Sequence, residues 1–184
     1  MHANRTIRDH FTFRVILQGM SHPGKVYPLP NLSGAGSAVI EILGCLMDNE
    51  VSFAVIGDRD METVIVRHTD SRPVSFEYAD YIIVRNGTTR GKLAGFKRGS
   101  LEYPDTGATS LYLVEALSEA KGEIVLTGPG VNGTASLRIT GLDPSELQLL
   151  RQVNSEFPLG VDAIFLDQGG HIACIPRSSR IGVN

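Results

Sequence analysis

The stretch VSFAVIG, residues 51–57, decides the fold class. Its residues are mostly apolar and β-branched or aromatic, and a glycine closes the run, which is typical of a short buried strand. The preceding residues 37–48 and the following residues 58–68 are both expected to be helical. In residues 37–48 the apolar side chains form one wide helical stripe, as in a helix packed on a sheet: Ala38, Val39, Ile42, Leu43 and Leu46.

Strand candidates continue along the rest of the chain. They lie at residues 81–84, 110–114, 123–127, 135–140, 162–166 and 172–175. The third and fourth of these are expected to pair as a hairpin, and so are the last two, which flank the turn Gln168-Gly169-Gly170. Helices and strands are mixed without strict alternation. We therefore predict a single α/β domain over residues 1–184, with a mixed β-sheet flanked by helices.

A helix is also expected near the N-terminus. Phe13, Ile16, Leu17 and Met20 recur at helical spacing, which places them on one face, with Arg14 on the other. The turn Ser21-His22-Pro23-Gly24 should end this helix, because proline disfavours helical geometry at the residue before it. Residues 1–10 are expected to be mobile, and residues 23–36 to form an ordered loop with a short strand.

The clearest helix start in the second half is Asp143-Pro144. Aspartate is a favoured N-cap and proline a favoured first helical residue. Glu146 stands where its carboxylate could return a hydrogen bond to the cap. Three apolar residues form the expected buried face of this helix: Leu147, Leu150 and Val153.

Composition excludes several classes of protein. The chain has 184 residues, and 17 basic against 20 acidic residues give a net charge of −3, which argues against a nucleic-acid binder. Cys45 and Cys174 form neither a disulfide framework nor a zinc-binding pattern, and they indicate a reducing compartment. Residues 1–10 lack the apolar run of a signal peptide, and no run is long enough to cross a membrane. We expect a cytoplasmic protein.

Several polar and glycine-rich turns are candidate sites. Gly128-Pro129-Gly130 follows a predicted strand, and such turns either bring backbone amides to a phosphate or only reverse the chain. Ser21 and His22 could belong to a catalytic cluster, although a tight turn explains Pro23 and Gly24. The five histidines show no metal-binding spacing, so no metal site is expected.

The C-terminal part offers a charged pair. Asp162, at a strand start, is placed to form an ion pair with Arg177, which follows the partner strand. In the alternative interpretation, Arg177 and Arg180 present their guanidinium groups to a phosphate or to a partner carboxylate. Arg14 has the same two interpretations, as an exposed surface charge or as a ligand. Physical reasoning on the residues alone identifies no self-sufficient catalytic constellation.

These turns together resemble a known family. Phe13-Arg14 with Leu17, Met20-Ser21 and Pro23-Gly24 resembles the opening signature of the PhnH family. Leu126-Thr127-Gly128-Pro129-Gly130 is similar to its central motif. Phe157-Pro158-Leu159-Gly160-Val161-Asp162 and Ile175-Pro176-Arg177 are similar to its C-terminal motifs. The signatures occur in order, so the resemblance covers nearly the whole chain.

The resemblance implies a function beyond what spacing shows. Members of this family are subunits of the bacterial carbon–phosphorus lyase system, whose G, H, I and J subunits are associated with making α-D-ribose 1-methylphosphonate 5-triphosphate from ATP and methylphosphonate. The implied fold is similar to the large domain of pyridoxal-phosphate-dependent transferases without their active site. No local motif marks a cofactor lysine here, so no cofactor is expected, and no catalytic residue is carried over.

The expected role is therefore that of a non-catalytic assembly subunit, docked on G, I and J partners and forming a homodimer when isolated. Two alternatives remain open. One is a nucleotide- or phosphate-binding enzyme, and the other is retained pyridoxal-phosphate binding. In the first, these residues converge on a triphosphate: Arg14, Gly128, Gly130 and Arg177. Four aromatic residues in the least regular part of the chain are the candidates for an exposed interface: Tyr78, Tyr81, Phe96 and Tyr103.

Overall fold

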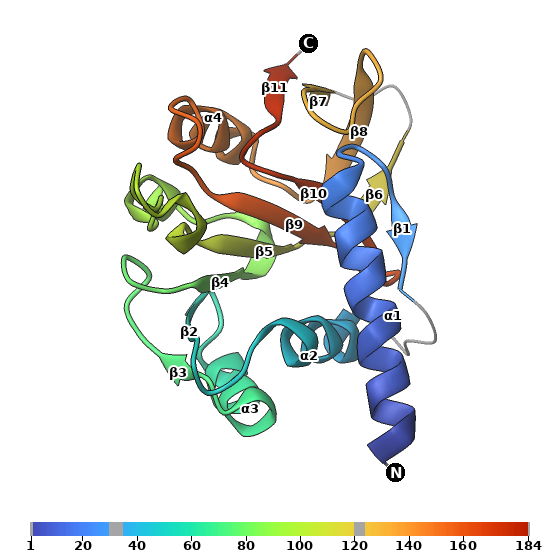
Figure 1. The fold of residues 1–184 in the computed structure, drawn as a ribbon, viewed down its shortest axis with the longest axis vertical. Helices are drawn as coiled ribbons and strands as arrows, with labels where there is room; N and C mark the ends of the chain where they lie inside the picture. The colour runs from blue at the N-terminus through green and yellow to red at the C-terminus, as the bar shows by residue number, and fades with distance from the viewer. Residues whose placement is uncertain (1, 30–34, 120–123, 184) are drawn as a thin grey trace.

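A seven-stranded mixed sheet forms the centre of the protein (Figure 1). The structure is a computed structural model that describes residues 2–29, 35–119 and 124–183. In spatial order the strands are β1 (Tyr27–Pro28), β10 (His171–Ile175), β9 (Asp162–Leu166), β5 (Thr109–Leu113), β4 (Tyr81–Val84), β2 (Ser52–Ile56) and β3 (Arg72–Pro73). The strands from β9 to β3 run parallel, whereas β10 and β1 are antiparallel to their neighbours. The predicted mixed sheet is confirmed.

Helices and a second sheet cover the two faces. On one face, α1 (His2–Ser21), α2 (Ala35–Leu46) and α3 (Arg59–Thr69) pack on a core that includes Phe53, Ile83 and Ile164. On the other face lie α4 (Pro144–Val153) and the short helices η1 (Arg85–Gly87) and η2 (Lys92–Gly95). A third short helix, η3 (Pro104–Thr106), precedes β5. Because both faces are covered, the parallel strands can be almost continuously apolar.

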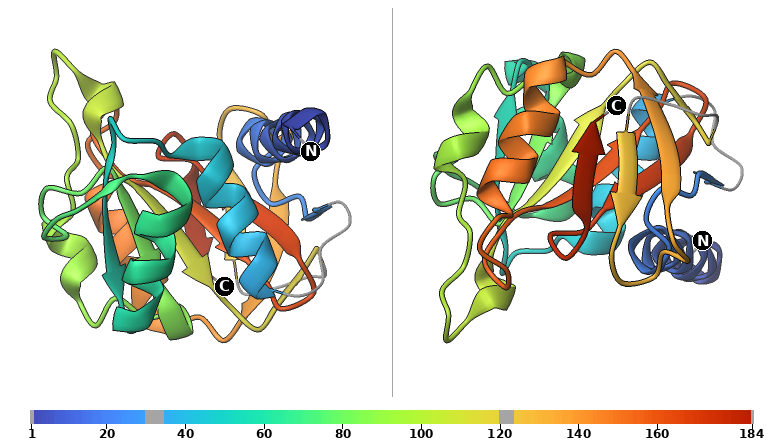
Figure 2. Two further views of the ribbon diagram at one scale, coloured as in Figure 1. Left: turned by 90° about the horizontal axis from the view of Figure 1, so that it is seen from below. Right: turned by 90° about the horizontal axis from the view of Figure 1, so that it is seen from above.

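The second sheet is antiparallel, in the order β11-β7-β8-β6. Its strands are β6 (Ala116–Ser118), β7 (Ile124–Thr127), β8 (Ala135–Thr140) and β11 (Arg180–Val183). The predicted hairpin of β7 and β8 is confirmed, as is that of β9 and β10. The strand expected over residues 123–127 corresponds to β7, and residue 123 lies outside the described residues. The C-terminal strand β11, which the sequence did not predict, lies beside β7 (Figure 2).

Helix α1 is present, but only part of the expected face packs: Ile16 and Met20 contact the core, and Phe13 and Leu17 do not. Phe13 and Leu17 are about half exposed, whereas Thr12 and Ile16 are buried. The helix approaches the sheet through Gly19, where an added Cβ would lie 2.8 Å from Sγ of Cys174. The close approach at this glycine sets the rotation of the helix, and Phe13 and Leu17 are turned outward. The helix begins at His2, within the stretch expected to be mobile.

Helix α4 has the predicted cap and the predicted buried face. The Asp143 carboxylate accepts a hydrogen bond from the backbone amide of Ser145, and Leu147, Leu150 and Val153 are buried. The expected bond from Glu146 to the cap is wrong. The amide of Asp143 already donates to the carbonyl of Gly87 at 3.0 Å, and the Glu146 carboxylate is buried in a different network.

Helix α3 also begins as expected, with Asp58 as its N-cap. Of the two free cysteines, Cys174 is buried in the sheet and Cys45 is partly buried. Within the described ranges, no helix combines the length and the apolar character needed to span a membrane.

Candidate functional site

Two glycine-rich turns pack directly against each other. Gly130 has a φ of +78°, and a Cβ added there would collide with the carbonyl group of Ser21 at the end of α1. Gly24, on the opposite turn, lies so close to β8 that its Cβ would be 2.8 Å from that of Ala135. Glycine is therefore required at Gly130 both for its backbone conformation and for this close approach.

The same region gathers the C-terminal motifs. Gly128 lies against the segment that leads into β11, where an added Cβ would be 3.0 Å from the carbonyl oxygen of Ser178. Gly160 lies against the side chains of Asn154 and Arg177. The four motif segments, far apart in sequence, are thus connected by direct contacts at one end of the sheets. Convergence of this kind depends on tertiary packing and cannot be derived from spacing.

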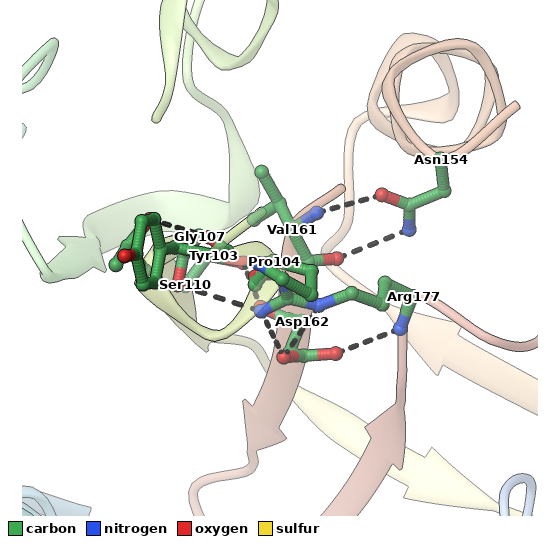
Figure 3. A network of polar contacts seen from close by, with 9 residues as sticks. Tyr103, Pro104, Gly107, Ser110, Asn154, Val161, Asp162 and Arg177 are labelled. Atoms are coloured by element: carbon green, nitrogen blue, oxygen red, sulfur yellow. Dashed lines mark hydrogen bonds and ion pairs between the residues drawn. The ribbon is translucent and has the colours of Figure 1, made fainter. Parts of the chain in front are cut away.

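Asp162 and Arg177 form the expected ion pair (Figure 3). Oδ1 of Asp162 accepts from the backbone amide of Arg177 at 2.7 Å, and Oδ2 accepts from its Nε and Nη2 at 3.0 and 2.5 Å. Nη1 of the same guanidinium donates to the carbonyl of Pro104 at 2.5 Å. The guanidinium of Arg177 is therefore bound by Asp162 and Pro104 of the same chain. This weakens the alternative interpretation, in which Arg177 binds a phosphate.

Asn154 ties the end of α4 to the start of β9. Its side-chain amide donates to the carbonyl of Val161 at 3.0 Å and accepts from the amide of Val161 at 2.7 Å (Figure 3). These two hydrogen bonds to Val161 resemble the backbone pairing between neighbouring β-strands. It fixes the turn that contains Gly160, which places Asp162 opposite Arg177.

A cavity of about 620 Å³ lies between the Gly128-Pro129 turn, the end of α4 and the start of β11. We call it the arginine cavity, because Arg151, Arg177 and Arg180 line it. Among the described residues that line it, none carries a carboxylate. Sequence reasoning identified Gly128, Arg177 and Arg180 but missed Arg151, whose position in the last turn of α4 is also typical of an ordinary helix-end cation.

The four residues expected to converge on a triphosphate do not all meet. Gly128 and Arg177 line the arginine cavity together, whereas Arg14 and Gly130 are not among its lining residues. Arg14 is exposed on α1, and Gly130 packs on the end of that helix.

The side chains of the possible catalytic cluster at residues 21–25 also have separate partners. Nδ1 of His22 lies 3.1 Å from the carbonyl of Gln18 in the preceding helix α1, and Nζ of Lys25 forms an ion pair with Glu119 at 2.9 Å. No group of three potential metal ligands occurs within residues 2–29, 35–119 and 124–183.

The four interface candidates fall into different environments. Tyr78 and Tyr103 are 74% and 63% exposed, and Tyr81 is partly buried. Phe96 is only 3% exposed, because it packs on Phe76 and joins the core beneath η2. The expectation that Phe96 belongs to an exposed interface is therefore wrong.

A buried carboxylate lies beneath η1 and η2. Glu146 is fully buried, and its carboxylate accepts hydrogen bonds from the amide and hydroxyl of Thr89, each at 2.7 Å. The hydroxyl of Tyr112 donates to the same carboxylate at 2.8 Å. Burial, together with the adjacent Glu146 carboxylate, raises the pKa of Tyr112 well above its usual value. The network is closed by protein groups, which indicates a structural role.

These observations define a class of protein: an α/β protein with a mixed sheet, in which paired side chains and closely packed glycines order the turns at one end. Residues 2–182 match the family described as "Bacterial phosphonate metabolism protein (PhnH)". The chain belongs to the PhnH family.

Two curated relatives support this assignment. The chain is 32% identical over 180 residues to a protein of Stutzerimonas stutzeri named "Putative C-P lyase subunit protein HtxG", covering 96% of this chain and 87% of that protein. It is 30% identical over 86 residues to "Alpha-D-ribose 1-methylphosphonate 5-triphosphate synthase subunit PhnH" of Rhizobium meliloti (strain 1021), covering 47% and 42% of the two chains.

Proposed function

We propose that this chain is the H subunit of a carbon–phosphorus lyase core complex in phosphonate metabolism. It supports formation of α-D-ribose 1-methylphosphonate 5-triphosphate from ATP and methylphosphonate, with G, I and J subunits as its partners. The observation that carries the proposal is the family match over residues 2–182. The names of both relatives as subunits support it further. Because ATP is a cytoplasmic metabolite, the same proposal places the protein in the cytoplasm.

Within the complex, we assign the chain an assembly role and not a catalytic one. The strongest candidates for reactive groups are occupied by structural partners, since Arg177 is held by Asp162 and Lys25 by Glu119. Nζ of Lys97 is likewise paired with Asp80, and Nζ of Lys92 lies 5.3 Å from the centre of the Phe76 ring. Each of these three lysines thus has a partner within the protein. The contacts support our proposal that the fold is similar to the large domain of pyridoxal-phosphate-dependent transferases but does not hold their cofactor. Lys121, the fourth lysine, lies outside the described residues.

Exposed apolar side chains support docking on partners. Helix α1 exposes four large apolar residues on its outer face: Ile7, Phe11, Phe13 and Leu17. A second group is exposed near the motif region: Leu101, Tyr103 and Phe157. Groups of exposed large apolar side chains are common at interaction sites, so these two regions are the candidates for subunit contacts and for the homodimer of the isolated chain.

Co-purification tests the assembly role. A tagged copy of this chain, produced with the G, I and J subunits of the same system, is expected to bring down those subunits in fixed proportion. Leu17→Glu with Phe13→Glu on α1 should reduce that recovery, because charges on an apolar docking face are costly to bury. A matched control is Glu62→Lys on the exposed side of α3. Recovery of no partner by the unaltered chain would contradict the proposal.

The oligomeric state of the isolated chain is measured by light scattering after gel filtration. We expect twice the 19.9 kDa mass of one chain. A single-chain mass at micromolar concentration would contradict the homodimer while leaving the partner complex to be judged by co-purification.

A further inference from the structure

The arginine cavity carries an inference that is independent of the assembly role. Arg151 and Arg180 both line it, and both side chains are exposed to the solvent. No hydrogen-bond or ion-pair partner holds either guanidinium within the described part of the chain. The third arginine, Arg177, is neutralised by Asp162. The cavity therefore has two positive charges that no carboxylate of a described lining residue neutralises.

The carboxyl end of α4 lies at the same cavity and partly offsets this charge. A helix C-terminus acts as roughly half a negative charge, which is smaller than the charge of one guanidinium. The balance at the cavity remains positive. Arginine presents several N–H donors in a planar fork, so two free arginines in one cavity are suited to a tetrahedral oxyanion such as a phosphate group.

A buried hydroxyl provides the second, separate observation. Ser179 lines the cavity and is 6% exposed, and its Oγ has no hydrogen-bond partner in the described structure. Buried polar atoms are nearly always paired, because an unpaired one loses its hydrogen bonds to water without replacement. The hydroxyl of Ser155, which also lines the cavity, already has a partner, since it donates to the carbonyl of Gln152 at 2.8 Å. The Oγ atom is shielded from solvent in its present rotamer, so a rotation of the Ser179 side chain about χ1 would be needed before a ligand oxygen in the cavity could supply the missing partner.

The floor of the cavity is fixed in place before any ligand arrives. The amide of Arg177 is bound to Asp162, and the amide of Ser179 donates to the carbonyl of Pro176 at 2.8 Å. Gly128 packs on Ser178 without a side chain that would extend into the space. A rigid turn of this kind lowers the entropic cost of ordering the site around a ligand.

We propose that the arginine cavity binds the phosphate group of a small phosphorylated molecule, with Arg151 and Arg180 as charged ligands and with Ser179 as a hydrogen-bond donor after rotation of its side chain. A volume of about 620 Å³ is within the range of small-molecule sites and leaves room for more than the phosphate group itself. The site would not use Arg177 as a direct ligand. It would use the Asp162–Arg177 pair to hold the floor.

Titration of the full-length chain with inorganic phosphate and with pyrophosphate tests the proposal. Calorimetry gives the affinity, and side-chain nitrogen NMR signals identify which arginines respond. We expect shifts of the Arg151 and Arg180 signals and tighter binding of pyrophosphate. Arg151→Ala and Arg180→Ala should each weaken binding roughly tenfold or more, since each removes charge-assisted hydrogen bonds. Ser179→Ala should weaken it less.

Arg67→Ala is the matched control, because Arg67 is also an exposed arginine in the last turn of a helix. It should bind phosphate with unchanged affinity. Equal weakening by Arg67→Ala, absence of binding at millimolar pyrophosphate, or equally tight binding of acetate would each overturn the proposal. The last result would indicate a docking site for a carboxylate of a partner. If Arg151→Ala and Arg180→Ala still co-purify with partner subunits, the phosphate site is independent of the assembly role.

Discussion

The carboxylate of Asp162 holds both the backbone amide and the guanidinium of Arg177, and so closes the open end of the β9–β10 hairpin. The same guanidinium reaches the carbonyl of Pro104 in η3. One pair thereby connects the hairpin to the segment that precedes β5. The motif arginine is fixed as part of the framework, and its neighbours Ser179 and Arg180, which line the arginine cavity, take no part in the pair.

Replacing Arg177 should therefore reduce stability. Both side chains of the pair are mostly buried, with 13% and 21% of the Arg177 and Asp162 side chains exposed. Arg177→Ala would leave Asp162 and the Pro104 carbonyl without partners, and we expect a loss of about 2–4 kcal/mol in the free energy of unfolding. Urea denaturation measures it. Arg180→Ala, at an exposed arginine three residues away, should change stability by less than about 0.5 kcal/mol. Equal effects of the two substitutions would refute the framework role.

Glu146 should behave as a structural carboxylate. Glu146→Ala would leave the hydroxyls of Thr89 and Tyr112 without their buried acceptor, and we expect a loss of about 2–4 kcal/mol in the free energy of unfolding. Tyr112→Phe removes one donor from the same network and should cost about 1–2 kcal/mol. As a control, Glu156→Gln alters an exposed carboxylate and should stay within about 0.5 kcal/mol. A Glu146→Ala protein as stable as the control would show that the network is dispensable.

The contact between the two glycine turns can be tested with matched substitutions. Gly130 and Gly133 have nearly equal φ values of +78° and +76°, but only Gly130 has a neighbour in the way of a Cβ. Gly133→Ala should cost about 1–2 kcal/mol for the left-handed conformation alone. Gly130→Ala pays this and must also displace the end of α1, so its loss in thermal or urea stability should be clearly larger. If both substitutions cost the same, α1 does not depend on this contact.

Stability at acid pH should depend on Asp80. Burial raises the pKa of this carboxyl, but hydrogen bonds from Lys97 and Ser52 outweigh burial and hold the pKa below its usual 3.8. A folded-state pKa below the unfolded value stabilises the protein above about pH 4, and this stabilisation is lost as pH falls through the folded value. Lys97→Met should therefore reduce stability at pH 6, and the difference from the unaltered chain should shrink as the pH falls below about 4. A difference that grows toward acid pH would contradict this assignment.

Local patterns predicted many of the elements. The cap at Asp143, the apolar face of α4 and the β9–β10 hairpin depend on neighbouring residues, and all three are present. The face on which α1 packs was only partly predicted, since Ile16 and Met20 pack on the core but Phe13 and Leu17 do not. Apolar spacing does not show how such a stripe is turned relative to the sheet. Here Gly19, which has no side chain to appear in an apolar pattern, is the point of contact.

The site was less predictable than the elements. Spacing suggested the pair of Asp162 and Arg177, since both flank one hairpin. It could not show that Arg151 joins Arg180 at the same cavity, because α4 and β11 meet only through tertiary packing. The burial of Phe96 also depends on tertiary packing. Its partner Phe76 lies in a loop, where no periodic pattern could have indicated the contact.

Reconstitution of the enzyme activity tests the central claim most directly. The G, I and J subunits would be assayed with ATP and methylphosphonate, with and without this chain, and this chain would be assayed alone. We predict that α-D-ribose 1-methylphosphonate 5-triphosphate forms with the full set, that product or recovered complex falls when this chain is left out, and that this chain alone makes none. Product formation by the isolated chain, or full activity and assembly of the other subunits without it, would contradict the account.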